Sequence, residues 1–292
     1  MPVLYEGITS GTDTQTGIKS YQIDNTKKLF ARWQEHLKSH RPNGVGADNE
    51  KDRGMMRRVL ILEHCTPTPD CDAGSVTVFN FMILLREMGF TITFIPEDNF
   101  CYLSEYTAAL QRIGVEVLYA PYVTSVAKHV KEFGQRYDLV FIFRPMVAER
   151  HFYTIREYCD KAKILYYAHD LHFLRMMREA DLFADAAKQR AAEEMKVREL
   201  AAISRCGASI VVTDVELDIL KAYIPVHNVY VFPLILSTHS ANKKFSARKD
   251  IIFFGSYQHP PNVDAVHYFV EKIMPFLLVP ACLTNQIITI IM

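Results

Sequence analysis

The stretch VLILEHCTPTPDCDAGSVTVFNFMILLREMGFTITFIP (residues 59–96) decides the fold of this chain. It opens with an apolar run at 59–62, continues through a loop into a helical pattern at 76–88, and returns to an apolar run at 91–95. Short, nearly continuous apolar runs on either side of a helix are typical of buried strands in a parallel sheet. The stretch therefore predicts a strand, a helix and a second strand parallel to the first.

The same alternation continues along the chain. Helices are expected to begin near Ser104 and Thr124, and a charged amphipathic segment runs over about 181–205. The sequence TVDE (213–216) forms a capping box at another helix start. Because crossovers between parallel strands are right-handed, the pattern predicts a doubly wound, Rossmann-like α/β domain. The expected strands are 59–63, 91–95, 115–119, 138–143, 163–168, 209–213 and 228–233.

Polar stretches divide the chain into segments. A short amphipathic helix is expected from about Thr26 to Leu37, with Asn25 as its cap. A strand at 250–256 and a helix at 259–277 read as the first βα unit of a second Rossmann-like domain. The expected division is a polar leader and linker (1–57), the Rossmann-like domain (58–236), a linker (237–249), and the incomplete start of a second Rossmann-like domain (250–292).

The composition is that of an ordinary globular protein, with 49% hydrophobic and 23% charged residues and a formal net charge of zero. This balance and the absence of a long Lys/Arg run argue against nucleic-acid binding.

The six cysteines form no CxxC pair, so we expect reduced thiols that are mostly buried. The N-terminus lacks the basic start and apolar core of a signal peptide, so we expect a cytoplasmic protein, peripheral at a membrane at most.

The uncharged tail at 273–292 matches the length that spans a bilayer. Two prolines and the amide pair Asn285-Gln286 interrupt it, and buried amides are costly in hydrocarbon. We therefore favour a helix end, a loop and the start of a buried strand over a membrane anchor.

The loop at 65–75 would lie beyond the carboxyl end of the first strand, where ligands of doubly wound sheets bind. It matches neither GxGxxG nor GxxxxGK[ST], so it carries no dinucleotide fingerprint and no P-loop. Gly74 permits close approach to the backbone, and the N-terminus of the following helix favours an anion. The alternative is a stiff turn in which Asp72 or Ser75 caps the helix.

Five stretches in order resemble one enzyme family. They are TPTPDCDAGSVTVFNFMILLREMGFTITFIP (66–96), YDLVFIFRP (137–145), YYAHDLHFLRMMREA (166–180), VVTDVELDIL (211–220) and IIFFGSYQHPPNVDAVHYFVEKIMP (251–275). Over about 58–277 the chain is similar to glycosyltransferases of the GT-B fold, family 4, although Gly89-Phe90-Thr91 lacks the His of the family pattern. The resemblance implies two Rossmann-like domains around a cleft, of which 58–236 would bind the acceptor and 250–292 would be the incomplete start of the donor domain. It also implies transfer of a sugar from a nucleotide-sugar to a glycan or lipid-linked acceptor, with retention of configuration, in polysaccharide or glycoconjugate biosynthesis.

The resemblance also implies a site. His169 would contact the donor sugar or stabilise charge at the reacting carbon, and Asp170 would orient it; a structural His-Asp pair is the alternative. For Arg144 the alternative is a surface ion pair, and for Asn262 it is a plain helix start. No cofactor and no metal is expected, because the two histidines of HDLH lack further ligands. The expected donor- or acceptor-binding residues are Gly74, Ser75, Asp72, Arg144, His172, Gly255, Ser256, His259 and Asn262.

Two family features are missing from these 292 residues. The family has an Arg and a Lys after the glycine turn of the donor domain, and GSYQHPPN has neither. Its Glu-x7-Glu segment has no counterpart, which indicates a truncated donor domain and leaves activity open. One alternative is a non-catalytic module that docks on a second copy or a partner chain through its incomplete C-terminal domain. The other is a nucleotide-sugar epimerase of the same architecture.

Overall fold

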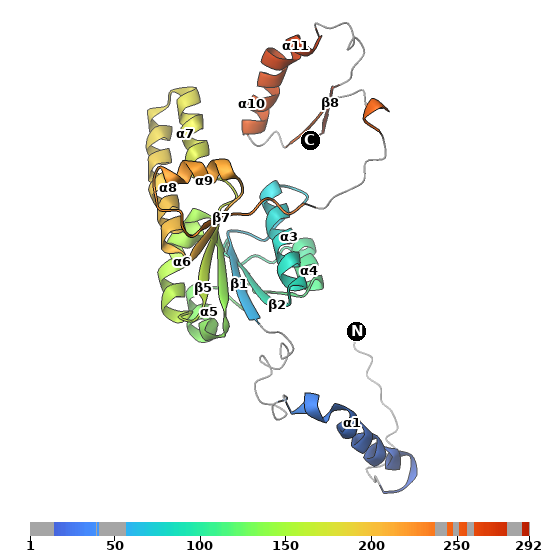
Figure 1. Cartoon of the computed structure of the whole chain (residues 1–292). Helices are drawn as coiled ribbons and strands as arrows, with labels where there is room; N and C mark the ends of the chain where they lie inside the picture. Colours follow the sequence, from blue (N-terminus) through green and yellow to red (C-terminus); the bar gives the residue numbers. More distant parts are fainter. Residues whose placement is uncertain are drawn as a thin grey trace. The chain divides into compact units, whose positions relative to one another are not determined.

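The computed structural model describes residues 15–38, 40, 57–236, 244–247, 251–255, 260–278 and 288–291 (Figure 1). The chain divides into two compact units, Met1–Met56 and Arg57–Met292.

The described part of the first unit is helical. A 3-10 helix, η1 (Gly17–Ser20), leads into α1 (Tyr21–Leu37). The sequence predicted a start near Thr26 with Asn25 as cap, and this is wrong, since the helix already runs through both residues. Ser20 occupies the N-cap and makes no side-chain capping bond, so the capping pattern carried no information about where this helix begins.

The second unit is built on a seven-stranded sheet in the order β3-β2-β1-β4-β5-β6-β7, with every neighbouring pair parallel. This order is the Rossmann order with one further strand, which confirms the predicted doubly wound α/β class. The strands are β1 (Arg57–Glu63), β2 (Phe90–Pro96), β3 (Val115–Val117), β4 (Leu139–Phe143), β5 (Lys163–Tyr167), β6 (Ala208–Val211) and β7 (Val229–Val231).

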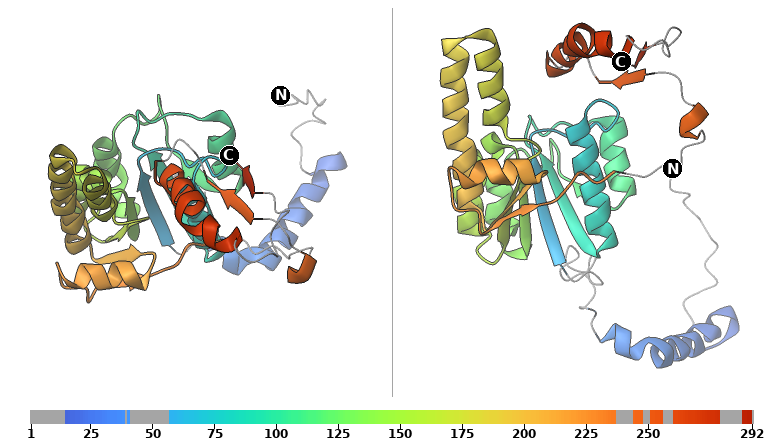
Figure 2. Two further views of the ribbon diagram at one scale, coloured as in Figure 1. Left: turned by 90° about the horizontal axis from the view of Figure 1, so that it is seen from above. Right: turned by 45° about the horizontal axis from the view of Figure 1, so that its top comes forward.

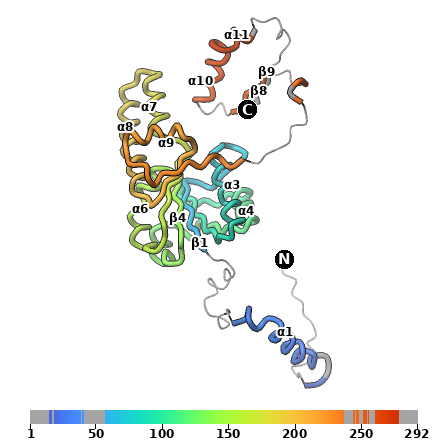
Figure 3. The backbone as a smooth tube through the Cα atoms, in the orientation of Figure 1, coloured from blue at the N-terminus to red at the C-terminus, as the bar shows by residue number. Residues whose placement is uncertain are grey.

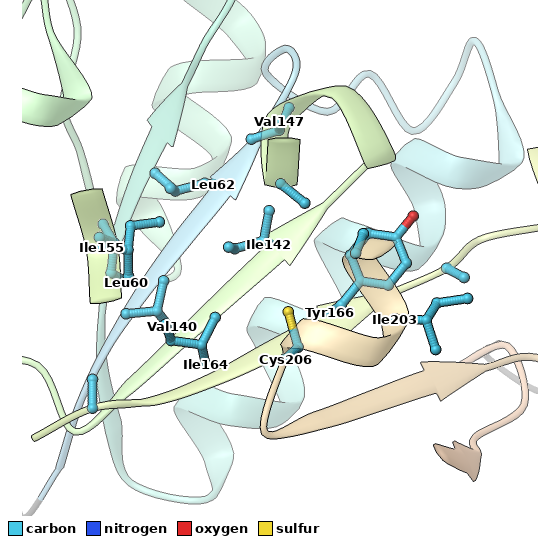
Figure 4. Close-up of a cluster of buried hydrophobic side chains, with 14 of the residues drawn as sticks. Leu60, Leu62, Val140, Ile142, Val147, Ile155, Ile164, Tyr166, Ile203 and Cys206 are labelled. Atoms are coloured by element: carbon cyan, nitrogen blue, oxygen red, sulfur yellow. The ribbon is translucent and has the colours of Figure 1, made fainter. Parts of the chain in front are cut away.

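Helices cover both faces of this sheet (Figure 2). Alternate residues of β1 point to opposite faces, so Leu60 and Leu62 join one buried cluster (Figure 4) while Val59 and Ile61 join another. Residues of α5, α6, α8 and α9 complete the first cluster, and residues of α3 and α4 complete the second. The helices are α3 (Ala73–Glu87), α4 (Ser104–Arg112), α5 (Val126–Phe133), the 3-10 turn η2 (Gly134–Arg136), α6 (Pro145–Tyr158), α7 (His172–Phe183), α8 (Ala186–Arg205) and α9 (Asp214–Lys221).

The strand order reverses between β1 and β4. The connection after β1 leads through α3 to β2, on one side, whereas the chain leaving β4 passes through α6 to β5, on the other. In doubly wound sheets a crevice opens at this switch point, outside the carboxyl ends of the strands. Residues just after β1, β4 and β5 therefore occupy the place where a ligand is expected.

The charged segment predicted as one unit over 181–205 is split in two. Ala184 has a left-handed backbone, with φ 50°, and ends α7. Asp185 then caps α8 by accepting hydrogen bonds from the backbone N–H groups of Ala187 and Lys188. The result is a pair of helices that lie side by side (Figure 3).

The C-terminal described residues form a small βαβ unit. β8 (Ile251–Phe254) pairs in parallel with β9 (Ile288–Ile291), and a helical segment lies between them in the sequence. This matches the predicted βα unit and the predicted return to a strand within the tail. Within the described residues, no helix is long and apolar enough to cross a membrane. The remaining elements are η3 (Phe245–Ala247), α10 (Pro260–Tyr268), the π-helical η4 (Phe269–Ile273) and α11 (Met274–Leu278).

The expectation that the cysteines are mostly buried is wrong for the described part of the chain. All five cysteines there are free, but only Cys159 and Cys206 are buried, and Cys71 is exposed. Burial raises the pKa of the Cys206 thiol to about 12, so this thiol behaves as a small apolar side chain.

Replacing Ser125 tests where α5 begins. The sequence predicted a start at Thr124, but the Ser125 Oγ accepts a hydrogen bond from the Lys128 N–H at 3.2 Å and forms the cap. Ser125→Ala should lower the free energy of unfolding by about 1 kcal/mol. The neighbouring residue supplies the matched control, since Ser125 and not Thr124 makes the capping bond, and Thr124→Ala should change the free energy of unfolding by less than ~0.5 kcal/mol. Urea unfolding of the full chain measures both, and equal losses would contradict the assignment.

His129 should make the protein less stable in mild acid. Burial lowers its pKa to about 4, and its Nε2 lies 2.7 Å from the Tyr137 hydroxyl. An unfolded histidine titrates near ~6.5. Between these values a fall in pH protonates only the unfolded chain, so stability declines. His129→Gln should flatten the decline of unfolding free energy between pH 6.5 and 4, and replacing the exposed His64 with Gln should not. An unchanged slope in His129→Gln would contradict the assignment.

Candidate functional site

The site at the switch point is organised by Glu63, the last residue of β1. Its side chain is 3% exposed, and Oε1 accepts a hydrogen bond from the Arg144 Nε at 2.8 Å. The same oxygen accepts the backbone N–H of His64 at 3.0 Å. Arg144 directly follows β4, so this ion pair bridges the two strands that flank the switch point.

Both members of the pair are charged. Burial alone would raise the pKa of Glu63, but the neighbouring His169 and the Arg144 charge outweigh it and hold the pKa below the usual 4.5. Burial likewise opposes the charge of Arg144, and Glu63 outweighs burial, so the pKa of the guanidinium is raised. A buried carboxylate is therefore kept ionised at the base of the site.

The backbone at Arg144 is strained. Its φ of 72° and ψ of 133° lie outside the regions that L-residues prefer, and Pro145 fixes the first position of α6 immediately afterwards. Gly74 leaves room for the side chain, because a Cβ atom there would lie 3.2 Å from the Arg144 Nη2. The glycine was predicted to admit a ligand, and in the structure it admits the guanidinium of Arg144.

Asp72 and Ser75 are engaged with each other. Asp72 is the N-cap of α3, accepting the Ser75 N–H at 2.8 Å and the Ser75 hydroxyl at 2.6 Å. This is the capping alternative that the sequence left open. The carboxylate neutralises the positive end of the helix, which makes this end a poor place for a diphosphate.

His169 follows β5 and is buried, with 7% of its side chain exposed. Its ring stacks on Phe143, with centroids 5.3 Å apart and planes 19° apart, and its Nε2 lies 3.6 Å from the Glu63 Oε2. Neither ring nitrogen has a hydrogen-bond partner among the described residues. Buried polar atoms are nearly always hydrogen-bonded, so these two nitrogens make the imidazole a candidate ligand-binding group.

Asp170 has a different role from the one assigned on sequence. Its carboxylate pairs with the Arg175 Nε at 2.9 Å and lies 3.3 Å from the His172 Nδ1. Burial would raise its pKa, but His172 and the two arginines Arg175 and Arg144 outweigh it, so the pKa is lowered. The carboxylate beside His169 is that of Glu63, so Glu63 is placed to orient the imidazole.

Glu199 of α8 is a second buried carboxylate that the sequence did not single out. It is fully buried and accepts the Phe173 N–H at 3.0 Å. Its other oxygen lies 3.1 Å from the His172 Nδ1. The negative charge therefore lies at the N-terminus of α7, where the helix dipole stabilises it, and it fixes the position of His172.

The C-terminal candidates are described by themselves. A Cβ atom at Gly255 would lie 2.8 Å from the Asn262 Nδ2, so the glycine allows the amide to approach the backbone. Asn262 lies in the first turn of α10, which begins at Pro260, in agreement with the helix-start alternative. Ser256 and His259 lie outside the described residues.

The sequence thus named most of the side chains that gather at the switch point and missed two carboxylates. Arg144, His169, Asp170 and His172 were visible because each follows the end of an apolar strand. Glu63 carries the same signal and could have been found by it.

Among the described residues, no group of three or more His, Cys, Asp or Glu side chains is arranged to hold a metal ion.

The surface hollows that the structure shows lie elsewhere. One of about 290 Å³ is lined by Met146, Glu149, Arg150 and Arg198, and a smaller one of about 110 Å³ continues it between α6 and α8. Neither is lined by Glu63 or His169. The site is therefore defined by its side chains and its place in the sheet, and not by a deep cavity.

Comparison with known proteins gives little beyond this geometry. No family model matches the chain, and no curated protein matches it. A matching solved structure is titled "Crystal Structure Analysis of the Glycotransferase of kitacinnamycin"; it has 11% identity and a TM-score of 0.37, and the match covers 80% of this chain and 70% of that one. A score this low does not identify a shared fold, so the α/β class stands on the strand order of the chain itself.

Glu63→Gln should destabilise the protein at neutral pH, because the half-buried Arg144 loses its charged partner. Breaking a fully buried pair costs about 3–5 kcal/mol. Since 29% of the Arg144 side chain is exposed, we expect about 2 kcal/mol in urea unfolding. The matched control is Glu149→Gln, whose exposed pair with Arg198 at 3.5 Å should contribute less than ~0.5 kcal/mol.

The difference in unfolding free energy between wild type and Glu63→Gln should also depend on pH. The folded pKa of Glu63 is depressed, so its stabilisation is present above its unfolded pKa and is lost as pH falls through the folded value. The gap between wild type and Glu63→Gln should stay constant above about pH 5 and close below it. A gap that persists at acid pH would show that the charge of Glu63 is not what stabilises the site.

Proposed function

We propose that this chain is a glycosyltransferase that moves a sugar from a nucleotide-sugar to an acceptor hydroxyl, with retention of configuration, in polysaccharide or glycoconjugate biosynthesis. Two independent lines support the proposal. The sequence resembles GT-B enzymes in five stretches, and three of them contain a residue that lies at the switch point, namely Gly74, Arg144 and His169. The buried, charged constellation there has the place and the chemistry of a ligand site.

The observation that carries the proposal is His169. Its imidazole is buried beside an ionised carboxylate, and both ring nitrogens lack a hydrogen-bond partner among the described residues. A sugar hydroxyl can donate a hydrogen bond to one nitrogen, while the Glu63 carboxylate, 3.6 Å from Nε2, orients the ring. A histidine held in this way can hydrogen-bond a substrate and stabilise positive charge that develops at the reacting carbon.

The other residues have supporting roles in this proposal. Glu63 orients His169, and His169 and Arg144 together hold the pKa of Glu63 below its usual value. Arg175 is the cation most available to an anionic leaving group, because its pair with Asp170 is half-exposed on both sides and is correspondingly weak. Asp72 and Ser75 hold the loop in shape, and the donor's nucleotide would be bound by residues of the C-terminal domain.

Thermal unfolding against a panel of nucleotides and nucleotide-sugars tests donor binding. A ligand that binds only the folded chain stabilises it by about 2.7 kcal/mol at one hundred times its Kd, which raises the midpoint by several degrees. We expect one nucleotide-sugar to raise the midpoint more than its free nucleotide does.

A transfer assay with that donor then tests the role of His169. His169→Ala should reduce turnover about 100-fold or more, the usual contribution of a positioned acid, base or charge-stabilising group. His64→Ala changes an exposed histidine in the following loop and should retain full turnover. Equal turnover in the two variants would refute the role of His169, and a cooperative transition without any ligand shift would refute donor binding by this chain.

A further inference from the structure

Three tyrosines form a cluster of contacting rings beyond the carboxyl ends of β2 and β3, here called the tyrosine platform; neighbouring ring planes are inclined at 50° and 80°, so each outer ring offers a face of its own. It consists of Tyr102, Tyr119 and Tyr122. The rings of Tyr102 and Tyr119 have centroids 4.7 Å apart, and those of Tyr119 and Tyr122 have centroids 5.7 Å apart. Tyr119 is therefore the central ring, in contact with both of the others.

The platform is held by the fold. Tyr119 packs against the buried cluster on the α3–α4 side of the sheet. The backbone N–H of Ala120 donates to the carbonyl of Phe100 at 2.9 Å, which ties the loop after β2 to the loop after β3. The Val123 N–H donates to the Tyr119 carbonyl at 3.0 Å and closes the turn that carries Tyr122. The three rings are thus presented by two loops that are fastened to each other.

The outer rings remain open to solvent although apolar surface is costly to expose. Tyr122 is 80% exposed and Tyr102 is 47% exposed. Single exposed apolar residues are ordinary, but aromatic rings gathered into one surface mark a place where something binds. Aromatic rings lose little conformational entropy on binding and offer a flat face with negative charge density.

Hydrogen-bonding groups are found on α4, which begins two residues after Tyr102, and on the loop after β1. Tyr106, four residues after Tyr102, donates its hydroxyl to the Asp70 Oδ2 at 3.0 Å. Asp70 belongs to the loop at 65–75, which also carries Asp72. The charged side chains of this loop are therefore carboxylates. Anions such as phosphate are disfavoured beside them, whereas a neutral ligand rich in hydroxyl groups can donate hydrogen bonds to them.

The platform also has a fixed place relative to the switch-point site. β3, β2 and β1 are successive neighbours in the sheet, so the end of β3 lies about 10 Å from the end of β1, two strand spacings away. Glu63 ends β1 and faces His169. A ligand that reaches from His169 to the platform must therefore be longer than one sugar ring.

We infer that the tyrosine platform is the subsite for an oligosaccharide acceptor, whose pyranose rings stack on Tyr102 and Tyr122 while its terminal hydroxyl lies at the switch point. This rests on the proposed function and narrows its acceptor from a glycan or a lipid-linked molecule to a neutral glycan. The C–H groups on one face of a pyranose carry partial positive charge and contact the negative face of an aromatic ring. The ring hydroxyls at its edge remain free to bond Asp70.

The test measures binding without any transfer reaction. Neutral tetrasaccharides of glucose, galactose, mannose and N-acetylglucosamine, with their monosaccharides, are titrated into the full chain by calorimetry. At least one tetrasaccharide should bind more tightly than its monosaccharide, and Tyr122→Ala and Tyr102→Ala should each weaken it about tenfold. The matched control is Tyr153→Ala, which removes a tyrosine of α6 that is 65% exposed. Because Tyr122 is so exposed, its variant should keep the wild-type unfolding midpoint.

The outcomes separate this inference from the proposed function. Binding that falls in Tyr122→Ala but not in Tyr153→Ala supports the platform, whether or not transfer is detected. The inference is overturned by any of three results: no tetrasaccharide binds, the monosaccharide binds equally well, or Tyr153→Ala is as harmful as Tyr122→Ala. An alkyl glycoside tests whether the platform binds a lipid chain instead. The inference is also overturned if Tyr122→Ala weakens the binding of the alkyl glycoside but not the binding of the tetrasaccharide. Failure of the donor and transfer assays alone would leave oligosaccharide binding intact and would refute only the reaction.

Discussion

The ion pair between Glu63 and Arg144 joins the ends of β1 and β4 at the place where the strand order of the sheet reverses. Backbone hydrogen bonds join β1 to β4 as they join the other neighbouring strands of the sheet. Beyond the strand ends, the chain continues from β1 towards β2 and from β4 towards β5, on opposite sides. The buried pair links the two strand ends at the point where these connections diverge. Buried ion pairs often add little net stability, so its value here lies in the arrangement that it specifies.

Other features of the site follow from this pair. Arg144 adopts a positive φ, and backbone strain of this kind persists only where the surroundings enforce it. A Cβ atom at position 74 would lie 3.1 Å from the Asp72 Oδ1 and 3.2 Å from the Arg144 Nη2, so a glycine there leaves room for both side chains. His169 lies against the free oxygen of Glu63, and its ring contacts the rings of Phe143 and Tyr167. The glycine, the strained arginine and the histidine are thus all grouped around this one charged contact.

The fold was predictable because buried parallel strands leave a strong signal. Runs such as VLIL and VFIF are apolar on both faces, since helices cover both faces of the sheet. The capping box of Thr213 and Glu216 was predicted and confirmed, because its two hydrogen bonds are local. The start of α5 was misplaced by one residue because Thr124 and Ser125 are equally good caps in sequence. The break at Ala184 was missed because alanine favours the helix that it ends there, and the signal for a new helix was the capping residue Asp185.

The site was predictable only where position in the sheet revealed it. A polar residue directly after a buried strand is a candidate by its place alone, which is how Arg144 and His169 were found. Glu199 could not be found in this way. It lies in a helix with several other acidic residues, and only the packing of α8 against α7 turns this one inward. Asp72 had two plausible roles, and the geometry of the cap, which the sequence cannot supply, separates them.

The charges around the site are divided between its two sides, and this bears on which substrate lies where. On the β2–β3 side are the cap of Asp72, the carboxylate of Asp70 and the tyrosine platform. On the β4–β5 side are the cations, of which Arg144 is committed to a buried carboxylate and Arg175 to a half-exposed one. An exposed pair contributes at most ~1 kcal/mol, so a phosphate can displace Asp170 from Arg175 at little cost, whereas displacing Glu63 from Arg144 would leave a buried charge unpaired. Within the proposed function, the anionic donor therefore belongs beside α7 and the neutral acceptor beside α4, with His169 between them.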